Sequence, residues 1–259
     1  MNSELKELRG QPLPSFAEAR SRRTNYRKYP IDRQSALFSE PTIDLTTLGL
    51  AGSNYYNRSD NPPYYTSIPG SLTGLYLRRS VAERLQRVNA RLATMGLELF
   101  IHDGFRPIEV QRYFHDVWMP GRVREAHPDW TDAQVLEETE RYWAAPSVDD
   151  NSPAPHATGG ATDLTLRFLA SGELLYMGSL FDDVTAIAHT DHFERDENVT
   201  SYSDKEAQAN RRVLYRTMTG EGFVNYSNEW WHFSWGDQMW AKISGAAAAH
   251  YGIALPPGR

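Results

Sequence analysis

The sequence predicts an α+β fold with a small, mainly antiparallel sheet flanked by helices. Two observations support this: helix-like and strand-like patterns are mixed along the chain, and the strand-like runs are short. A chain of 259 residues, 40% hydrophobic and 23% charged, is long enough to bury a core of its own. We expect a single domain over residues 46–259, preceded by an irregular extension over residues 1–45 that wraps on the domain.

Helix signals occur in several segments. The first expected helix starts at Ser80, where Ser80-Val-Ala-Glu83 resembles a capping box, and its apolar stripe continues to Met95. The other expected helices run over about 107–119, from 131 onward, over about 203–219 from a second capping box at Ser203, and over about 236–249. These helices would flank the sheet.

Strand signals lie between the helices. Residues 97–102 alternate between apolar and polar side chains, as a half-buried strand does. Further short strands are expected at 163–168, 223–226 and 230–235. Residues 51–70 are rich in Asn, Tyr, Pro and Gly, which marks a loop. Tyrosines of this loop, such as Tyr56, could line a cleft or cover the core.

Composition excludes several classes of function. The formal net charge is −6 and no basic run is interleaved with aromatic residues, so we expect no nucleic-acid partner. No apolar stretch approaches the roughly 20 residues that span a bilayer, and the N-terminus lacks the apolar core of a secretory signal. We therefore expect a cytoplasmic protein without membrane contact. The absence of cysteine excludes disulfides and thiolate metal sites.

His156 is the first candidate ligand among eight histidines. It precedes a Gly159-Gly160 pair, and Asp163 opens an expected strand seven residues after the histidine. The two glycines permit a tight turn, so the side chains of His156 and Asp163 can converge. The alternative interpretation is a hairpin whose strand begins with a capping aspartate.

A second candidate set occurs in the segment Asn228-Glu-Trp-Trp-His-Phe-Ser-Trp235. His232 lies between bulky aromatic residues on an expected strand, which would hold its imidazole in a dry, fixed position. Glu229 precedes His232 by three residues, so strict alternation places it on the opposite face. Glu229 can share a site with His232 only from a bulge or loop at the start of the strand. The alternative is an aromatic strand with a core histidine.

Together, His156, Asp163 and His232 predict one zinc ion per chain, held in a central cleft. Two imidazoles and one carboxylate are a usual catalytic zinc set that leaves a fourth position for water. Zinc lowers the pKa of such a water to about 7. Glu229, a carboxylate outside the metal set, is the candidate general base. Arg106 lies between a strand end and a helix start and could stabilise an oxyanion, with a structural ion pair as its alternative role.

Five motifs in this order resemble the M15 metallopeptidases, and in particular the D-alanyl-D-alanine dipeptidases of the VanX type. The motifs span residues about 80–235. They are Asp103-Gly-Phe-Arg-Pro107, His156-x6-Asp163 within a segment ending Gly160-Ala-Thr-Asp-Leu-Thr-Leu166, Met177-Gly-Ser-Leu-Phe-Asp182, Ala209-Asn-Arg-Arg212, and Glu229-Trp-Trp-His-Phe233.

The resemblance implies a role for each matching residue. His156, Asp163 and His232 would bind zinc, and Glu229 would act as general base and then general acid. Arg106 would polarise the scissile carbonyl and stabilise the oxyanion. The implied reaction is hydrolysis of D,D-dipeptides, chiefly D-Ala-D-Ala, a peptidoglycan precursor, in a small closed cavity.

The chain departs from the family pattern before the first zinc histidine and in Met177-Gly-Ser-Leu180, where the family commonly has Met-Gly-Thr followed by a small residue. The family usually has Ser or Thr two residues before the first zinc histidine, where this chain has Ala154, and the nearest hydroxyl is Ser152. We therefore take Ser152 as a candidate substrate-binding residue, together with Asp103 and Tyr56. The sequence assigns no role to His189 and His192, and it does not indicate the oligomeric state.

Three alternative functions fit parts of this pattern. A D,D- or L,D-carboxypeptidase or a peptidoglycan endopeptidase would use the same zinc site on longer substrates. A non-haem iron oxygenase also uses two histidines and a carboxylate, but it usually spaces them two residues apart and has no need of Glu229. A metal-binding module without catalysis would have no need of Glu229 or Arg106.

Overall fold

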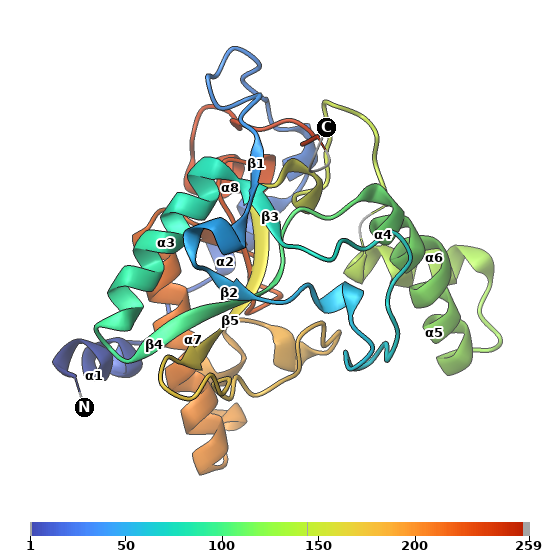
Figure 1. Ribbon diagram of the computed structural model, residues 1–259. Coiled ribbons are helices and arrows are strands. Elements are labelled where there is room, and N and C mark those ends of the chain that lie inside the picture. The colour runs from blue at the N-terminus through green and yellow to red at the C-terminus, as the bar shows by residue number, and fades with distance from the viewer. Residues whose placement is uncertain (1, 144, 256–259) are drawn as a thin grey trace.

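The computed structural model describes residues 2–143 and 145–255 (Figure 1). The ends of the expected extension and domain, residues 1 and 256–259, lie outside this described part. Within it, no helix is both long and apolar enough to cross a bilayer. The α+β class predicted from the sequence is confirmed, because helices surround two small sheets.

A five-stranded sheet with the order β2-β4-β5-β7-β6 lies at the centre of the fold. Its strands are β2 (Ala51–Gly52), β4 (Leu97–Asp103), β5 (Ala161–Phe168), β6 (Val224–Asn225) and β7 (His232–Ser234). Within this sheet, β2 and β4 pair in parallel and the other three pairs are antiparallel. A separate antiparallel pair joins β1 (Thr42–Asp44) to β3 (Tyr76–Arg78). The sheet is therefore mainly antiparallel, as predicted.

Helices flank the sheet on opposite sides of the view in Figure 1. On one side lies α3 (Arg79–Ala93), whose apolar stripe Val81, Leu85, Val88 and Leu92 is fully buried. On the other side lie α4 (Ile108–Tyr113), α5 (Met119–Ala126) and α6 (Asp132–Tyr142). A π-helical turn, Phe114–Trp118, joins α4 to α5. The stripe on α3 has the 3.6-residue period of a helix packed on one face, as the sequence indicates.

The predicted capping boxes of two helices are wrong. The Ser80 hydroxyl donates to Glu40 at 2.7 Å, so α3 begins without a side-chain cap. The helix α7 (Tyr202–Gly220) starts before Ser203, because Ser201 and Asp204 form the capping box instead. In both cases a tertiary or nearby partner competes with the expected local cap.

The predicted ends of two helices also differ. The helix expected over 107–119 continues through the π-helical turn into α5, so helical structure extends to Ala126. The tail helix α8 (Gln238–Ser244) is shorter than expected. It ends because Gly245 adopts a left-handed conformation with φ 79°.

The N-terminal extension is not irregular as expected but contains α1 (Ser3–Gly10) and α2 (Ala17–Arg23). The Asn2 side chain caps α1 by accepting from the amides of Glu4 and Leu5. The extension does wrap on the domain, since α1 packs against α7 and α2 packs against α8. Its helices owe their positions to these tertiary contacts, which have no local sequence signal.

Candidate metal centre and active site

The register of the sheet brings Asp163 and His232 together. The two residues are directly opposite each other on the antiparallel strands β5 and β7, so their side chains share one face. Asp163 is 1% exposed and His232 is 6% exposed. The Nδ1 atom of His232 lies 3.0 Å from Oδ1 of Asp163.

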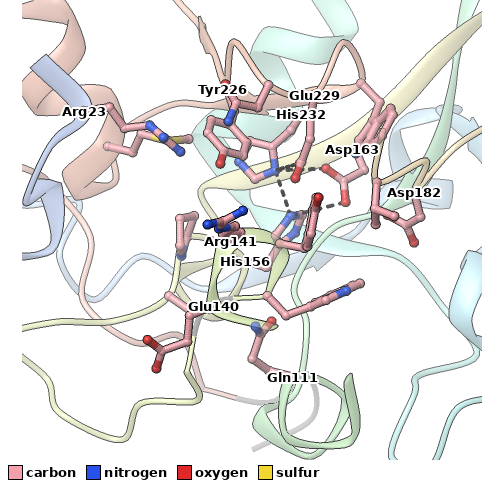
Figure 2. Close-up of a pocket in the computed structure, with 18 of the residues that line it drawn as sticks. Arg23, Gln111, Glu140, Arg141, His156, Asp163, Asp182, Tyr226, Glu229 and His232 are labelled. Carbon is pink, nitrogen blue, oxygen red and sulfur yellow. Dashed lines mark hydrogen bonds and ion pairs between the residues drawn. The ribbon is translucent and has the colours of Figure 1, made fainter. Parts of the chain in front are cut away.

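His156 approaches the same point from a short 3-10 turn, His156–Thr158. Gly159 follows in the left-handed region with φ 69°, which turns the chain into β5. The Nε2 atom of His156 lies 3.3 Å from Oδ2 of Asp163 and 3.2 Å from Nδ1 of His232. Figure 2 shows the three side chains pointing toward one another.

The hydrogen bonds of the two imidazoles direct one nitrogen of each into the cluster. Nδ1 of His156 lies 2.8 Å from the carbonyl oxygen of Gly104. A carbonyl only accepts, so Nδ1 carries the proton and Nε2 presents its lone pair. Nε2 of His232 faces the Ser234 hydroxyl at 3.4 Å, which leaves Nδ1 directed at Asp163. Such outer contacts orient metal-binding histidines in known sites.

The cluster has the properties of a cation site. One ligand atom from each of His156, Asp163 and His232 lies within 4.8 Å of the others. The Oδ1 atom of Asp163 is buried and accepts no hydrogen bond from any residue that the structure describes. Burial acts to raise the pKa of Asp163, but His156 and His232 outweigh it and hold that pKa well below its usual range. A buried carboxylate beside two imidazoles matches the donor set that zinc prefers.

Glu229 lies in a turn before β7, as it must if it is to face His232. The turn is closed by the Glu229 amide donating to the Tyr226 carbonyl at 2.8 Å and the Tyr226 amide donating to the His232 carbonyl at 3.0 Å. This geometry brings Oε2 of Glu229 to 3.7 Å from Nδ1 of His232. Burial and the charge of Asp163 raise the pKa of Glu229 to about 8. A carboxylate with such a pKa is a suitable proton acceptor near neutral pH.

Arg106 follows β4 and lies beside the cluster. Its guanidinium donates to Asp163 Oδ2 at 3.1 Å and to Asp103 Oδ2 at 2.8 Å. A further nitrogen donates to the Tyr56 hydroxyl at 3.2 Å. Asp103 and Tyr56 are each 1% exposed, and both hold the guanidinium in place. A direct contact of these two residues with a substrate stays a prediction.

A cavity of about 590 Å³ opens over the cluster. Its lining includes the expected residues Arg106, His156, Asp163, Glu229 and His232. Ser152 lines an adjoining pocket instead, so the structure does not bring it to the cluster. The volume is in the usual range for sites that enclose a small molecule.

Asp182 is a lining residue to which the sequence assigned no role, although it ends the motif Met177–Asp182. Its Oδ2 accepts hydrogen bonds from the hydroxyls of Tyr56 and Tyr64, both at 2.8 Å. Burial and the charge of Asp163 raise the pKa of Asp182 to about 8. Of the two unassigned histidines, His189 also lines the cavity.

The raised pKa of Asp182 predicts a pH-dependent stability in the metal-free protein. An ordinary Asp has a pKa of about 3.9 in an unfolded chain, so between pH 4 and 8 the folded state binds more protons and stability falls as pH rises. Asp182→Asn, which resembles the protonated form, should remove this component. Because Asp182 is only partly shielded from solvent, we expect the variant to gain about 1–2 kcal/mol relative to wild type between pH 5 and 8.

Urea unfolding of both proteins at several pH values measures this difference. Asp129→Asn is the matched control, because Asp129 is an exposed aspartate in the turn between α5 and α6 and does not line the cavity. Equal pH dependence in Asp182→Asn and Asp129→Asn would show that Asp182 does not carry the effect.

Comparisons with known proteins show the family of the chain. Residues 73–249 match the Peptidase_M15 family, described as D-ala-D-ala dipeptidase. A D-alanyl-D-alanine dipeptidase of Synechocystis sp. is 31% identical over 176 residues, which cover 64% of this chain and 71% of that protein. A D-alanyl-D-alanine dipeptidase of Enterococcus faecium is 33% identical over 153 residues, which cover 59% of this chain and 69% of that protein.

Among solved structures, VanYB in complex with D-alanine-D-alanine aligns over 79% of this chain and 94% of that chain. Its TM-score is 0.40 and its sequence identity is 18%. The family match covers more than half of the 259 residues and includes every residue of the cluster, together with Glu229 and Arg106. The chain therefore belongs to the M15 family of peptidases and is itself a peptidase.

Proposed function

We propose that this chain hydrolyses D,D-dipeptides such as D-alanyl-D-alanine, using one zinc ion held by His156, Asp163 and His232. The observation that carries the proposal is the buried cluster of these three residues with Glu229 at 3.7 Å from His232, within one cavity. Family membership supports the substrate class, because the relatives in Synechocystis sp. and Enterococcus faecium carry the name D-alanyl-D-alanine dipeptidase.

The surrounding side chains have separate tasks in this reaction. Zinc in the cluster would lower the pKa of a water molecule and polarise the scissile carbonyl. Glu229 takes the proton of the attacking water and passes it to the leaving amino group. Arg106, held by Asp103 and Tyr56, directs its positive charge to the oxygen that becomes negative in the transition state.

Asp182 is suited to bind the amino end of the substrate. A free dipeptide carries an ammonium group at this end, and Asp182 lies in the cavity wall with its second carboxylate oxygen not used by the two tyrosines. An ammonium beside this carboxylate would favour the ionised form of Asp182. This contact would select substrates with a free amino terminus.

The substrate class is tested directly with zinc-loaded protein. D-Ala-D-Ala should release free D-alanine, while L-Ala-L-Ala and a pentapeptide ending in D-Ala-D-Ala should react much more slowly. Preference for the pentapeptide would instead support the carboxypeptidase alternative. Absence of any peptide cleavage by protein with one zinc ion per chain would contradict the proposal. The cytoplasmic location, the lack of nucleic-acid and membrane partners, and a role in peptidoglycan metabolism stay predictions.

A further inference from the structure

The cavity has groups of opposite charge at its two ends. In Figure 2, Asp182 lies on one side of the cluster of His156, Asp163 and His232, and Arg23 lies on the other side. Both residues line the cavity. A free dipeptide has the matching polarity, with an ammonium at one end and a carboxylate at the other. We propose that Arg23, a residue of the N-terminal extension, binds the terminal carboxylate of the substrate; this inference rests on the proposed function.

Arg23 is placed by a well-anchored helix. It is the last residue of α2, and Arg20 in the preceding turn forms an ion pair with Asp191 at 2.7 Å. At the other side of α2, Arg22 donates to the carbonyl of Ile243 at 3.1 Å, and the Lys242 ammonium donates to the Thr24 carbonyl. These contacts tie α2 both to the loop that follows Asp182 and to α8. The guanidinium of Arg23 is thus presented from a fixed backbone.

The guanidinium of Arg23 faces the metal cluster across one aromatic ring. Its central carbon lies 4.5 Å from the centroid of the Tyr226 ring, at cation–π distance. The Tyr226 ring in turn meets the His232 ring edge-to-face, with centroids 5.8 Å apart. Figure 2 shows Tyr226 between Arg23 and His232. The cation is therefore close enough to the cluster to serve one end of a small substrate bound there.

Arg23 differs from the other arginines that line the cavity. Arg106 is paired with Asp103 and Asp163, and Arg141 is paired with Glu137 and Glu138. Arg27 donates to the backbone carbonyls of Ala145 and Ser152.

No carboxylate in the described part of the chain lies at ion-pair distance from Arg23, although its side chain is half-buried. Partial desolvation of a guanidinium is costly without an anion, and a carboxylate is its best planar partner. Arg23 acts electrostatically on Glu229, whose pKa it lowers, but it has no carboxylate at ion-pair distance, so its charge can act on a bound anion.

Besides Arg23, the extension contributes Tyr26 and Arg27 to the cavity lining, and Arg27 already donates to two backbone carbonyls. The lining also includes the apolar residues Ala154, Pro155 and Met239. The adjoining pocket, which Arg23 and Arg27 also line, adds Lys28 and so extends the positive charge away from the cluster. Arg23 lies outside residues 73–249 that match the family, so the extension would add a specificity-determining residue to the matched catalytic part.

The test compares substrates with and without the terminal charge. Wild type and Arg23→Gln are assayed with D-Ala-D-Ala and with D-Ala-D-alaninamide, which lacks the carboxylate. Charge-assisted hydrogen bonds contribute about 1.5–3 kcal/mol, so kcat/KM of the variant for the acid should fall about 10- to 100-fold. The loss should appear mainly as a higher KM, and the amide should be affected less than about 3-fold. Arg23→Lys, which retains the cation, should recover part of the activity on the acid.

Arg79→Gln is the matched control, because Arg79 is an exposed arginine on α3 that neither lines the cavity nor belongs to the helix that carries Arg23. Equal losses for acid and amide in Arg23→Gln, or no loss for either, would overturn the role of Arg23. Arg141→Gln is assayed in the same way. If this variant, and not Arg23→Gln, loses activity only on D-Ala-D-Ala, then Arg141 binds the substrate carboxylate and the proposed role of Arg23 is overturned. Wild type that cleaves neither substrate would overturn the proposed function and this inference together. Circular dichroism melting of each variant separates these outcomes from a folding defect.

Discussion

Glu229→Gln is expected to lower kcat for D-Ala-D-Ala by about 10²- to 10⁴-fold while the zinc content stays at one ion per chain. Glutamine keeps the size and hydrogen-bonding capacity of the side chain but cannot accept a proton. Glu229 is outside the ligand cluster, with its carboxylate 3.7 Å from His232, so its substitution leaves all three ligands in place. Steady-state kinetics and metal analysis of the purified variant measure both expectations.

The pH profile supplies an independent measurement. Burial and Asp163 raise the pKa of Glu229 to about 8, and a base must be ionised to act. In the wild type, kcat should therefore increase with pH through the pKa of Glu229. With a dication in the site the ionised form gains stability, so the midpoint should lie below 8. The residual activity of Glu229→Gln should lack this rising limb.

Glu140→Gln is the matched control for the base. Glu140 also lines the cavity, but its side chain is 52% exposed and comes from α6, away from the cluster. The Glu140→Gln variant should retain activity within about 2-fold of wild type, because most substitutions of exposed residues are nearly neutral. Activity of Glu229→Gln within a few-fold of wild type would show that another group takes the proton.

Removal of one ligand should have the second large effect. His232→Ala is expected to weaken zinc binding by more than 100-fold, since loss of a group that only orients a ligand already costs about 10- to 100-fold. The measurement is competition with a chromophoric chelator, followed by the activity assay. Asp163→Asn hardly changes the shape of the side chain and should also weaken zinc binding. Because it leaves no cavity, weaker binding in this variant cannot be explained by a packing defect of the kind that His232→Ala could cause.

Thermal unfolding reports the same loss without any enzyme assay. A ligand that binds only the folded state, at a concentration 1,000 times its dissociation constant, adds about 4 kcal/mol to the free energy of unfolding. Saturating zinc should therefore raise the melting temperature of wild type. The increase should be lost in His232→Ala and in Asp163→Asn. His127→Ala, an exposed histidine outside the cavity, should respond to zinc as wild type does. An unchanged response in both ligand variants would contradict the proposed metal set.

The sequence by itself determined the fold class and the elements with strong local patterns. The stripe of α3 and the alternation of β4 were predictable because each pattern depends on burial of one face. The motifs around His156, Asp163, His232 and Glu229 were also readable, since the spacing to glycines and aromatic residues is local. The condition that Glu229 must precede the strand came from simple alternation, and the turn before β7 meets it.

Only the tertiary structure decided which distant residues meet. The pairing of β5 with β7 sets Asp163 opposite His232, and this register depends on contacts between segments about 70 residues apart. Ser80 appeared to be a cap by its local pattern, but Glu40 takes its hydroxyl. Arg23 had no local signal, because its place beside Tyr226 follows from the packing of α2 on α8. Local patterns therefore determined the helices, the strands and the candidate ligands. Long-range packing decided which of these residues meet at the cavity and which charged side chains line it.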